Sequence, residues 1–396
     1  MKNLYFRELY PRLLQKCMKR VLIEQMRLLA LVAGMFALTS ANAQKVTVDG
    51  LKYYLYPDTH EAAVDNGNTW SGELVLPSAI SYDGETYTVS GMGHMAFYGC
   101  KELTKVRIPK TIDHVVHHTM SGWNGAVSDE YMNPFVGCTA LESIEVDGEN
   151  PNMKSVGGVL FSKDGTRLYC YPAGLKAEKY VVPEDVTWIG GDAFTYNEYV
   201  VSVELPAAVT YIGGGAFTYC KGLEKVSLPD NLTQLRGHTF RDCSSLKSIE
   251  IPAGVSTLGE QAFSGCTSLS VIDLPESVQT IGSFAFQNCT LDALVIRGQL
   301  DSQSTVPYLF HGLSESSKVY TLASQTDSFK KLFAGTVLTL DEYKNYQGTT
   351  NIDISISPYG KLSATYNLQG RRVTSQPWPS MYIREGKVVV VKNRPQ

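Results

Sequence analysis

The sequence lacks the short motifs that identify common enzyme classes. It contains no H-E-x-x-H, no G-x-S-x-G, no phosphate-binding G-x-x-x-x-G-K-S/T and no C-x-x-C. Each of these motifs places a reactive group or a set of ligands where its chemistry needs it. We therefore expect no catalytic residues, no cofactor and no metal. An enzyme that uses inserted loops is the least supported class of function.

Positive charge is scarce outside the N-terminus. Residues 1–43 carry seven Lys/Arg and two Asp/Glu, and the remaining chain has 28 basic residues against 37 acidic ones. Nucleic acids and anionic membranes are bound by basic surfaces, because the partner carries negative charge. Because acidic residues outnumber basic ones, we expect no nucleic-acid partner.

Long apolar runs are also lacking. The run Leu28–Leu38 has eleven residues, which span about 16 Å as a helix, whereas the hydrocarbon core of a bilayer is about 30 Å thick. A transmembrane helix is therefore the weaker interpretation, and we do not expect an integral membrane protein. Basic residues precede the run, and Ala41 and Ala43 follow it at the positions of a signal-peptidase site.

This pattern predicts a secretory signal peptide with an N-terminal extension at 1–43, cleaved after Ala43. The mature chain would be secreted or displayed at the cell surface. Translation could begin at Met1, Met18 or Met26.

What the chain does contain is a repeat of 23 residues. The template is C-x-x-L-x-x-I-x-I/L-P-x-x-V-x-x-I-G-x-x-A-F-x-x-C, and residues 243–266 match it closely. The positions that recur most regularly at intervals of 23 residues are apolar. They are Phe194, Phe217, Phe240, Phe263 and Phe286, with Cys220, Cys243, Cys266 and Cys289; Phe97 and Phe135 begin the array less regularly.

Each part of the template has a structural meaning. The x-I-x-I stretch alternates as a short strand does, proline ends it, V-x-x-I-G is a second extended segment, and A-F-x-x-C is a helical or 3₁₀ turn. One such coil cannot bury its own apolar face, but stacked coils can. The sequence therefore predicts a solenoid with a parallel β-sheet of short strands and a 3₁₀ or helical turn in each coil.

Interruptions and changes in composition divide the chain. One insertion, 114–134, is polar; another, 148–174, predicts a β-hairpin that turns at Asp164-Gly165. Both are candidate contact sites. We expect an N-terminal β segment or cap at 44–69, a solenoid at 70–342, a linker at 343–351 and a small all-β segment at 352–396.

The motifs L-x-x-I-x-I-P and I-G-x-x-A-F-x-x-C resemble the BspA-like leucine-rich repeats of Gram-negative surface and secreted proteins. The likeness covers roughly residues 70–340. It implies the leucine-rich-repeat solenoid fold and, loosely, extracellular binding, in some members adhesion to host matrix proteins. The tail YNLQGRRV…MYIREGKVVVVK is similar to the C-terminal domain that sorts proteins through type IX secretion; a relic or a plain β-unit are the alternatives.

Cysteine and histidine are the residues most open to chemistry. Six of the seven cysteines after residue 43 occupy the same slot of the repeat, which favours buried thiols over disulfides, because a ladder keeps the Cβ vectors parallel. His114, His117 and His118 have a spacing that could present two imidazoles to a metal. A polar surface insertion is the simpler interpretation.

One surface can be derived from the template. The residue after the middle Ile of L-x-x-I-x-I points away from the core, and along the stack it is often acidic. The column contains Glu145, Glu204, Glu250 and Asp273 and continues to Val295; Trp123 and Tyr131 in the first insertion are rival contacts. We predict a non-catalytic binding protein with a protein or glycan partner; the acidic column suits a protein partner with a basic patch. The alternatives are a solvated face and a structural or scaffold protein of the envelope.

Overall fold

A computed structural model of the 396-residue chain describes residues 44–116, 133–301 and 306–343, and the backbone of 380–384 and 387–391. The predicted signal peptide, Trp123, Tyr131, His117 and His118 lie outside the described residues. The chain divides into two units, Met1–Val337 and Leu338–Gln396. Each is considered by itself.

The first unit begins with a sheet that starts before the repeat and joins it at residues 85–93. Strands β1 (Gln44–Val48), β2 (Leu51–Tyr56) and β3 (Glu61–Val64) form an antiparallel meander, and β3 then pairs in parallel with β6 (Glu85–Gly93). The hairpin of β5 (Ala79–Tyr82) with β6 completes the order β1-β2-β3-β6-β5, with β8 (His114–Val116) beside β6. Its turn, Asp83-Gly84, has positive φ at both residues, as tight hairpins require.

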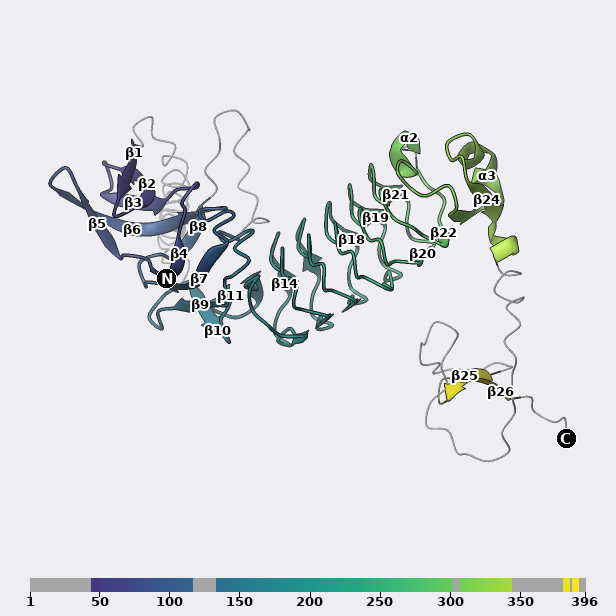
Figure 1. Ribbon diagram of the computed structural model, residues 1–396, viewed down its shortest axis with the longest axis horizontal. Helices are drawn as coiled ribbons and strands as arrows, with labels where there is room; N and C mark the ends of the chain where they lie inside the picture. Colours follow the sequence, from purple (N-terminus) through teal and green to yellow (C-terminus); the bar gives the residue numbers. More distant parts are fainter. Residues whose placement is uncertain (1–43, 117–132, 302–305, 344–379, 385–386, 392–396) are drawn as a thin grey trace, which may run out of the picture. The chain divides into compact units, whose positions relative to one another are not determined.

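The coils of the repeat build two parallel ladders (Figure 1). The first ladder comes from L-x-x-I-x-I, and in the regular coils it pairs residues one repeat apart, such as Ser202 with Lys225. Its strands form three sheets. They are β4 (Ser71–Val75), β7 (Glu102–Ile108) and β9 (Ser143–Val146); β13 (Lys179–Val181), β15 (Ser202–Glu204) and β17 (Lys225–Ser227); and β20 (Val271–Leu274), β22 (Ala293–Ile296), β23 (Lys318–Thr321) and β24 (Thr336–Thr339).

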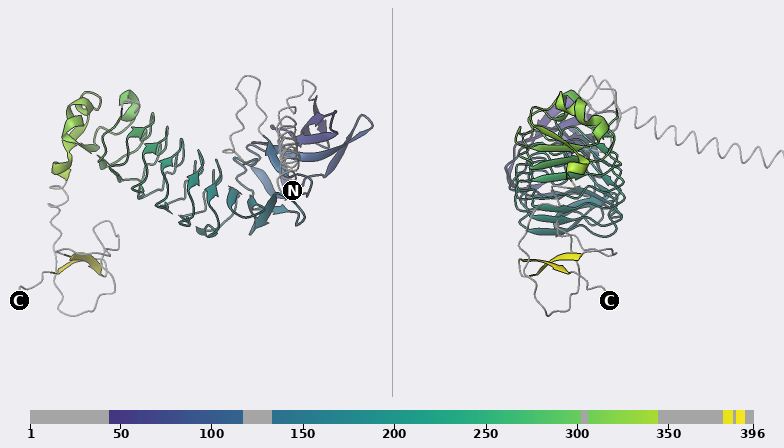
Figure 2. Two further views of the ribbon diagram at one scale, coloured as in Figure 1. Left: turned by 180° about the vertical axis from the view of Figure 1, so that it is seen from behind. Right: turned by 90° about the vertical axis from the view of Figure 1, so that its right-hand side faces the viewer.

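The second ladder comes from V-x-x-I-G, which supplies only two strand residues to most coils. It runs from β12 (Arg167–Cys170) through β14 (Trp188–Ile189) to β16 (Tyr211–Ile212), and again from β18 (Gln234–Leu235) through β19 (Thr257–Leu258) to β21 (Thr280–Ile281). Both ladders are visible as rows of short segments in the two further views (Figure 2).

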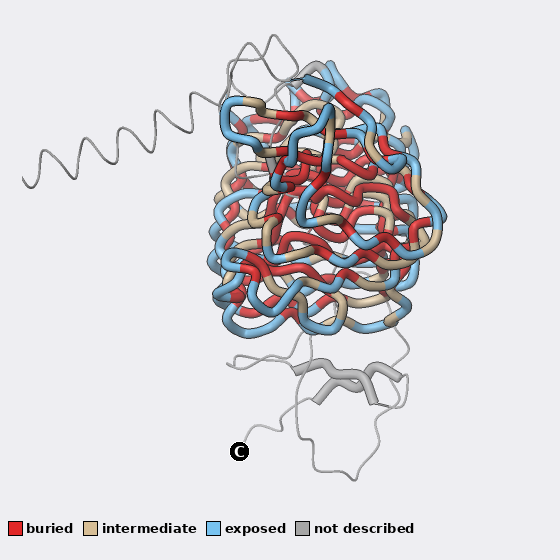
Figure 3. Tube along the Cα trace, turned by 90° about the vertical axis from the view of Figure 1, so that its left-hand side faces the viewer, coloured by how far each residue is buried: buried red, intermediate tan, exposed pale blue. Residues whose placement is uncertain are grey.

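A file of phenylalanine rings fills the space between the ladders. From Phe194 to Phe286 the rings stack on their neighbours in the next coil, with centroids 4.8, 5.2, 5.5 and 6.2 Å apart, and each is fully buried. Figure 3 shows buried residues inside the coils and exposed residues around them. This arrangement confirms the predicted solenoid.

The hairpin in 148–174 is a partition between two cores. It consists of β10 (Met153–Val156), β11 (Val159–Ser162) and β12, and β11 and β12 enclose the expected turn at Asp164-Gly165. Leu160, Tyr169 and Cys170 pack into the core of the N-terminal sheet and first coils. Their strand neighbours Phe161 and Leu168 pack into the core of the later coils. Both faces of β11 are buried, so a partner that contacts this insertion would meet its exposed residues, such as Val156, rather than β11.

Two short helices belong to the C-terminal end of the first unit. They are α2 (Val306–Leu309) and α3 (Ala323–Lys330), and Phe310 packs against Phe329 and Phe333 with ring centroids 5.2 Å away in each case. In the second unit, β25 (Ser380–Arg384) and β26 (Lys387–Val391) form an antiparallel hairpin. The rest of the predicted C-terminal segment lies outside the described residues.

Candidate binding face

The outward side chains of the first ladder form a face, called here the sheet face. Strand alternation sends the middle residue of each strand inward, so Ile144, Val203 and Val226 are buried. The residues on either side point outward. Those of β9, β15 and β17 are Ser143 and Glu145, Ser202 and Glu204, and Lys225 and Ser227.

The acidic column of this face is paired with basic residues of neighbouring strands. Glu145 accepts from Lys105 Nζ at 2.5 Å and from Arg107 Nε at 3.1 Å, both on β7. Glu204 accepts from Lys179 of β13 at 2.7 Å. The hydrogen bond from Lys105 keeps the pKa of Glu145 below its ordinary value, with Arg107 adding to the effect.

The column ends with a bidentate pair. Arg297 donates to both carboxylate oxygens of Asp273, through Nε at 2.6 Å and through an Nη at 2.8 Å, the two-pronged geometry that suits guanidinium and carboxylate. Beyond it, Val295 and Ala293 are buried, with exposed fractions of 0% and 4%. The expectation that the exposed column continues to Val295 is therefore wrong, and the sheet face stops at β20.

The sheet face is thus closer to electrical balance than its acidic residues suggest. Three of the four predicted carboxylates are bound to Lys or Arg, and Glu250 is exposed at the same position of its coil. Val181 and Val271 add exposed apolar surface, with 52% and 38% of their areas accessible. A surface of ion pairs, serines and valines can dock a partner.

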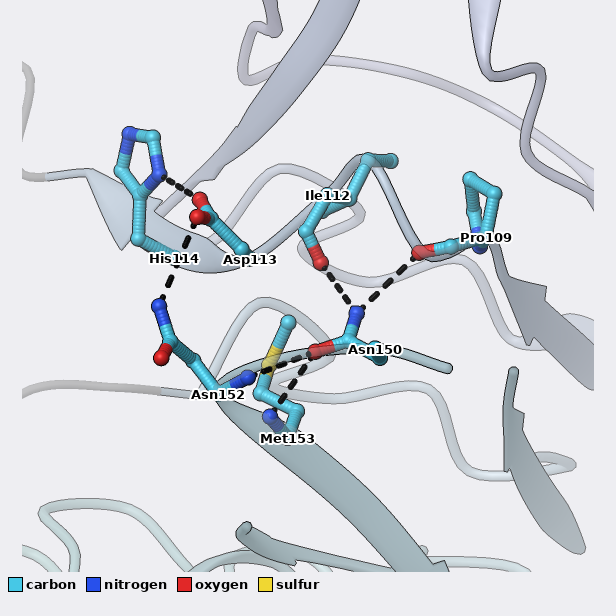
Figure 4. Close-up of polar contacts among 7 residues, drawn as sticks. All are labelled: Pro109, Ile112, Asp113, His114, Asn150, Asn152 and Met153. Atoms are coloured by element: carbon cyan, nitrogen blue, oxygen red, sulfur yellow. Dashed lines mark hydrogen bonds and ion pairs between the residues drawn. The ribbon is translucent and has the colours of Figure 1, made fainter. Parts of the chain in front are cut away.

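His114 and Asp113 form the polar start of the first insertion. Asp113 receives a 2.6 Å hydrogen bond from His114 Nδ1 and a 3.4 Å hydrogen bond from Asn152 Nδ2 (Figure 4). Among the described residues, no group of three or more His, Cys, Asp or Glu side chains could hold a metal ion. His117 and His118, the other two histidines of the motif, are not among them.

Asn150 ties this region to the solenoid. Its buried amide donates to the carbonyl oxygens of Pro109 and Ile112 at 3.1 and 2.7 Å, and its Oδ1 accepts from the backbone N–H groups of Asn152 and Met153 (Figure 4). Sequence reasoning did not single out this residue. The available signal was an asparagine directly before a proline, where turns begin.

The seven described cysteines are free and buried. Burial raises the pKa of the Cys138 and Cys289 thiols to about 12 and also raises the pKa of the Cys243 thiol. From Cys138 onward, each thiol of the repeated slot donates to the carbonyl oxygen of the phenylalanine in the preceding coil, at 3.0 or 3.1 Å; the pairs are Cys138–Phe97, Cys220–Phe194, Cys243–Phe217, Cys266–Phe240 and Cys289–Phe263. The slot therefore carries a hydrogen bond as well as volume.

Comparison with known proteins places this geometry in a family. The profile of the BspA type leucine-rich repeat region matches six copies, in overlapping stretches that run from residue 85 to residue 354. The chain belongs to the BspA-type leucine-rich repeat family. This is a family of repeats, and no catalytic family is indicated.

Three solved structures are similar to this BspA-type chain. The pneumococcal vaccine antigen PcpA is 17% identical, covers 75% of this chain and 98% of its own, and has a TM-score of 0.48. A leucine-rich repeat protein from Bacteroides ovatus is 22% identical, with coverages of 74% and 76% and a TM-score of 0.41. A leucine rich cell surface protein from Faecalibacterium prausnitzii is 16% identical, with coverages of 75% and 100% and a TM-score of 0.37.

No curated protein matches the BspA-type chain. Within the described part of the chain, none of the helices has the length and apolar character needed to cross a bilayer.

Proposed function

We propose that the chain is a non-catalytic binding protein, secreted or displayed at the cell surface, that docks a protein partner on its sheet face. The observation that carries the proposal is the line of ion pairs across adjacent strands, from Lys105–Glu145 through Lys179–Glu204 to Asp273–Arg297. These pairs are largely exposed to solvent, so they contribute little to stability. Their regular placement along one face is better explained by recognition, because complementary charges select a partner and set its register.

Charge reversal on the sheet face tests this proposal. A variant with Glu204→Lys, Glu250→Lys and Asp273→Lys should lose at least tenfold in affinity for any extracellular-matrix protein that the parent binds in a solid-phase assay. The matched control reverses Glu184, Asp230 and Glu276, three exposed acids beside the prolines that end the strands. Equal affinity of parent and sheet-face variant would overturn the proposal, as would equal losses in the two triple variants.

Export is the second part of the proposal. A signal peptide at 1–43 would leave Gln44 as the first residue, and β1 begins at that residue.

We further propose residues 352–396 as a sorting segment of the type IX kind, a role with which the β25–β26 hairpin is compatible. Mass spectrometry of the mature N-terminus tests the cleavage site. Fractionation of cells that produce a chain truncated after Thr350 tests the sorting segment, and unchanged delivery to the outside would refute it.

A further inference from the structure

The corner of each coil, after the buried phenylalanine, has a position with a left-handed backbone. This is the second residue after Phe, and its φ is positive in every described coil of the array. Glycine, asparagine or aspartate, which tolerate this conformation best, fill it at Gly99, Gly137, Asp242, Gly265, Asn288 and Gly312.

Two successive coils break this rule with tyrosine. Tyr196 and Tyr219 hold φ values of 63° and 59°. A bulky side chain in the left-handed region strains the backbone, and such strain concentrates at functional sites. The two tyrosines are only half-buried, so filling of the core does not account for them.

The two rings belong to a row of side chains along this corner. They stack with centroids 4.7 Å apart and planes inclined by 17°, and Arg241 of the next coil lies 5.8 Å from the centre of the Tyr219 ring. On the other side, Tyr196 lies over Gly137, where an added Cβ would come within 3.9 Å of its ring. Burial and the neighbouring phenols of Tyr98 and Tyr219 raise the pKa of Tyr196 to about 12. Tyr98, Tyr196, Tyr219 and Arg241 are called here the tyrosine row.

We propose that the tyrosine row binds an extended, uncharged polysaccharide that lies along the solenoid axis. The row is a surface separate from the sheet face, so this inference stands independently of the docking role proposed for that face.

The spacing of the row favours a linear polymer of sugars. Rings in successive coils are held at the strand spacing of about 4.8 Å, which is close to the length of one pyranose unit in an extended chain. Neighbouring sugars could then meet the same contact, a phenol that donates to and accepts from their hydroxyls. A protein partner would need about 800 Å² of contact surface, more than a single row of side chains supplies.

The charge of the row favours a neutral ligand. Arg241 lies 3.3 Å from the carboxylate of Asp242, so its charge is compensated. The phenol of Tyr196 is neutral at physiological pH, as a tyrosine of ordinary pKa also is, because burial raises its pKa further above 7. Tyr98, whose area is 55% exposed, gives one end of the row an open aromatic surface.

The test uses substitutions that restore the residue found in other coils. Binding of the mature chain to cellohexaose, laminarihexaose, mannohexaose and maltohexaose is measured by calorimetry, with the parent expected to bind at least one of them. The double variant Tyr196→Gly/Tyr219→Gly should lose at least tenfold in affinity while its melting temperature stays within a few degrees of the parent, because glycine relieves the left-handed strain. Tyr219→Phe, which keeps the stack but removes one phenol, should lose part of the affinity.

Asn288→Gly is the matched control, since it makes the same change of backbone at the same position of a coil without a tyrosine. It should leave binding unchanged. Failure of the parent to bind any of the four oligosaccharides would overturn the proposal. So would full affinity in the double variant, or binding only to heparin or polygalacturonate that disappears with added salt.

Discussion

The Sγ atom of Cys243 donates a hydrogen bond to the carbonyl oxygen of Phe217 at 3.0 Å, across the boundary between two coils. The same carbonyl accepts the backbone N–H of Cys220 in its own coil at 3.2 Å. One phenylalanine carbonyl thus accepts two hydrogen bonds, one from the turn of its own coil and one from the cysteine of the next coil. The bond recurs down the stack, so the cysteine slot is a joint between coils as well as part of the core.

Replacing this thiol should separate its two roles. Cys243→Ala removes both the sulfur volume and the donor, and we expect a loss of about 1–3 kcal/mol in the free energy of unfolding, from the small cavity and the unpaired carbonyl lone pair. Cys243→Ser keeps a donor and should be at least as stable as the alanine variant. Urea unfolding measures both. A serine variant clearly less stable than alanine would show that the slot requires only apolar volume.

The phenylalanine file predicts a larger effect. Phe263→Ala should lower the free energy of unfolding by about 3–5 kcal/mol, because a fully buried ring is removed between two others. Ser268→Ala, at an exposed position a few residues later, should change it by less than about 0.5 kcal/mol. Thermal and urea unfolding of the two variants compare them directly, and similar losses would contradict the stacking.

Alkaline pH should weaken the fold. Burial raises the pKa of the Cys138 and Cys289 thiols from 9 to about 12 and moves Cys220, Cys243 and Cys266 in the same direction. A raised pKa in the folded state means that the neutral thiols stabilise the fold fully below pH 9. That contribution is lost as the pH rises from 9 toward 12 and the unfolded chain releases protons that the folded chain retains.

The measurement is the urea midpoint as a function of pH, expected to fall above pH 9. Thiol titration is its companion: a thiol reagent at pH 8 should leave the described cysteines unmodified in the native protein and label them in denaturant. Rapid labelling of the native chain would contradict the burial of the slot.

Asn150 gives a test of the link between the hairpin and the solenoid. Asn150→Ala leaves two carbonyl oxygens and two N–H groups without their partners in a buried site, and we expect a loss of about 2–4 kcal/mol. Asn150→Asp keeps the acceptor and replaces the donor by a buried charge, so it should be no better. The readout is the unfolding transition, with Asn152→Ala, an exposed neighbour, as the control.

The repeat itself could be recognised in the sequence because every position of a coil recurs in the next coil. Twenty-three-residue spacing assigns Phe263 and Ile272 to the core without reference to the rest of the chain, and the short strands follow from the x-I-x-I alternation. The N-terminal sheet and the separation of the two cores by the hairpin could not be predicted from the sequence to the same degree. A strand such as β11, buried on both faces, looks like any short apolar run, and only its two neighbours in space reveal that Leu160 and Phe161 enter different cores.

The predicted binding residues show the same limit. Alternation placed Glu145 and Glu204 on the outside, but it gave no sign that Lys105 and Lys179 reach across to them, because these contacts join residues one or more coils apart. The tyrosine row was hidden for another reason. Tyr196 and Tyr219 stand where the template has no fixed residue, and their meaning depends on the left-handed backbone that the fold imposes there.

The pairing of Lys179 with Ser202 and of Ser202 with Lys225 has a consequence for how the molecule can change in size. Removing 206–228 would bring residue 205 to residue 229, and each would meet neighbours of the same kind as before. Loss or duplication of one whole unit of the gene thus preserves the strand register and the apolar slots of the core. The stack can be lengthened or shortened in steps of a single coil.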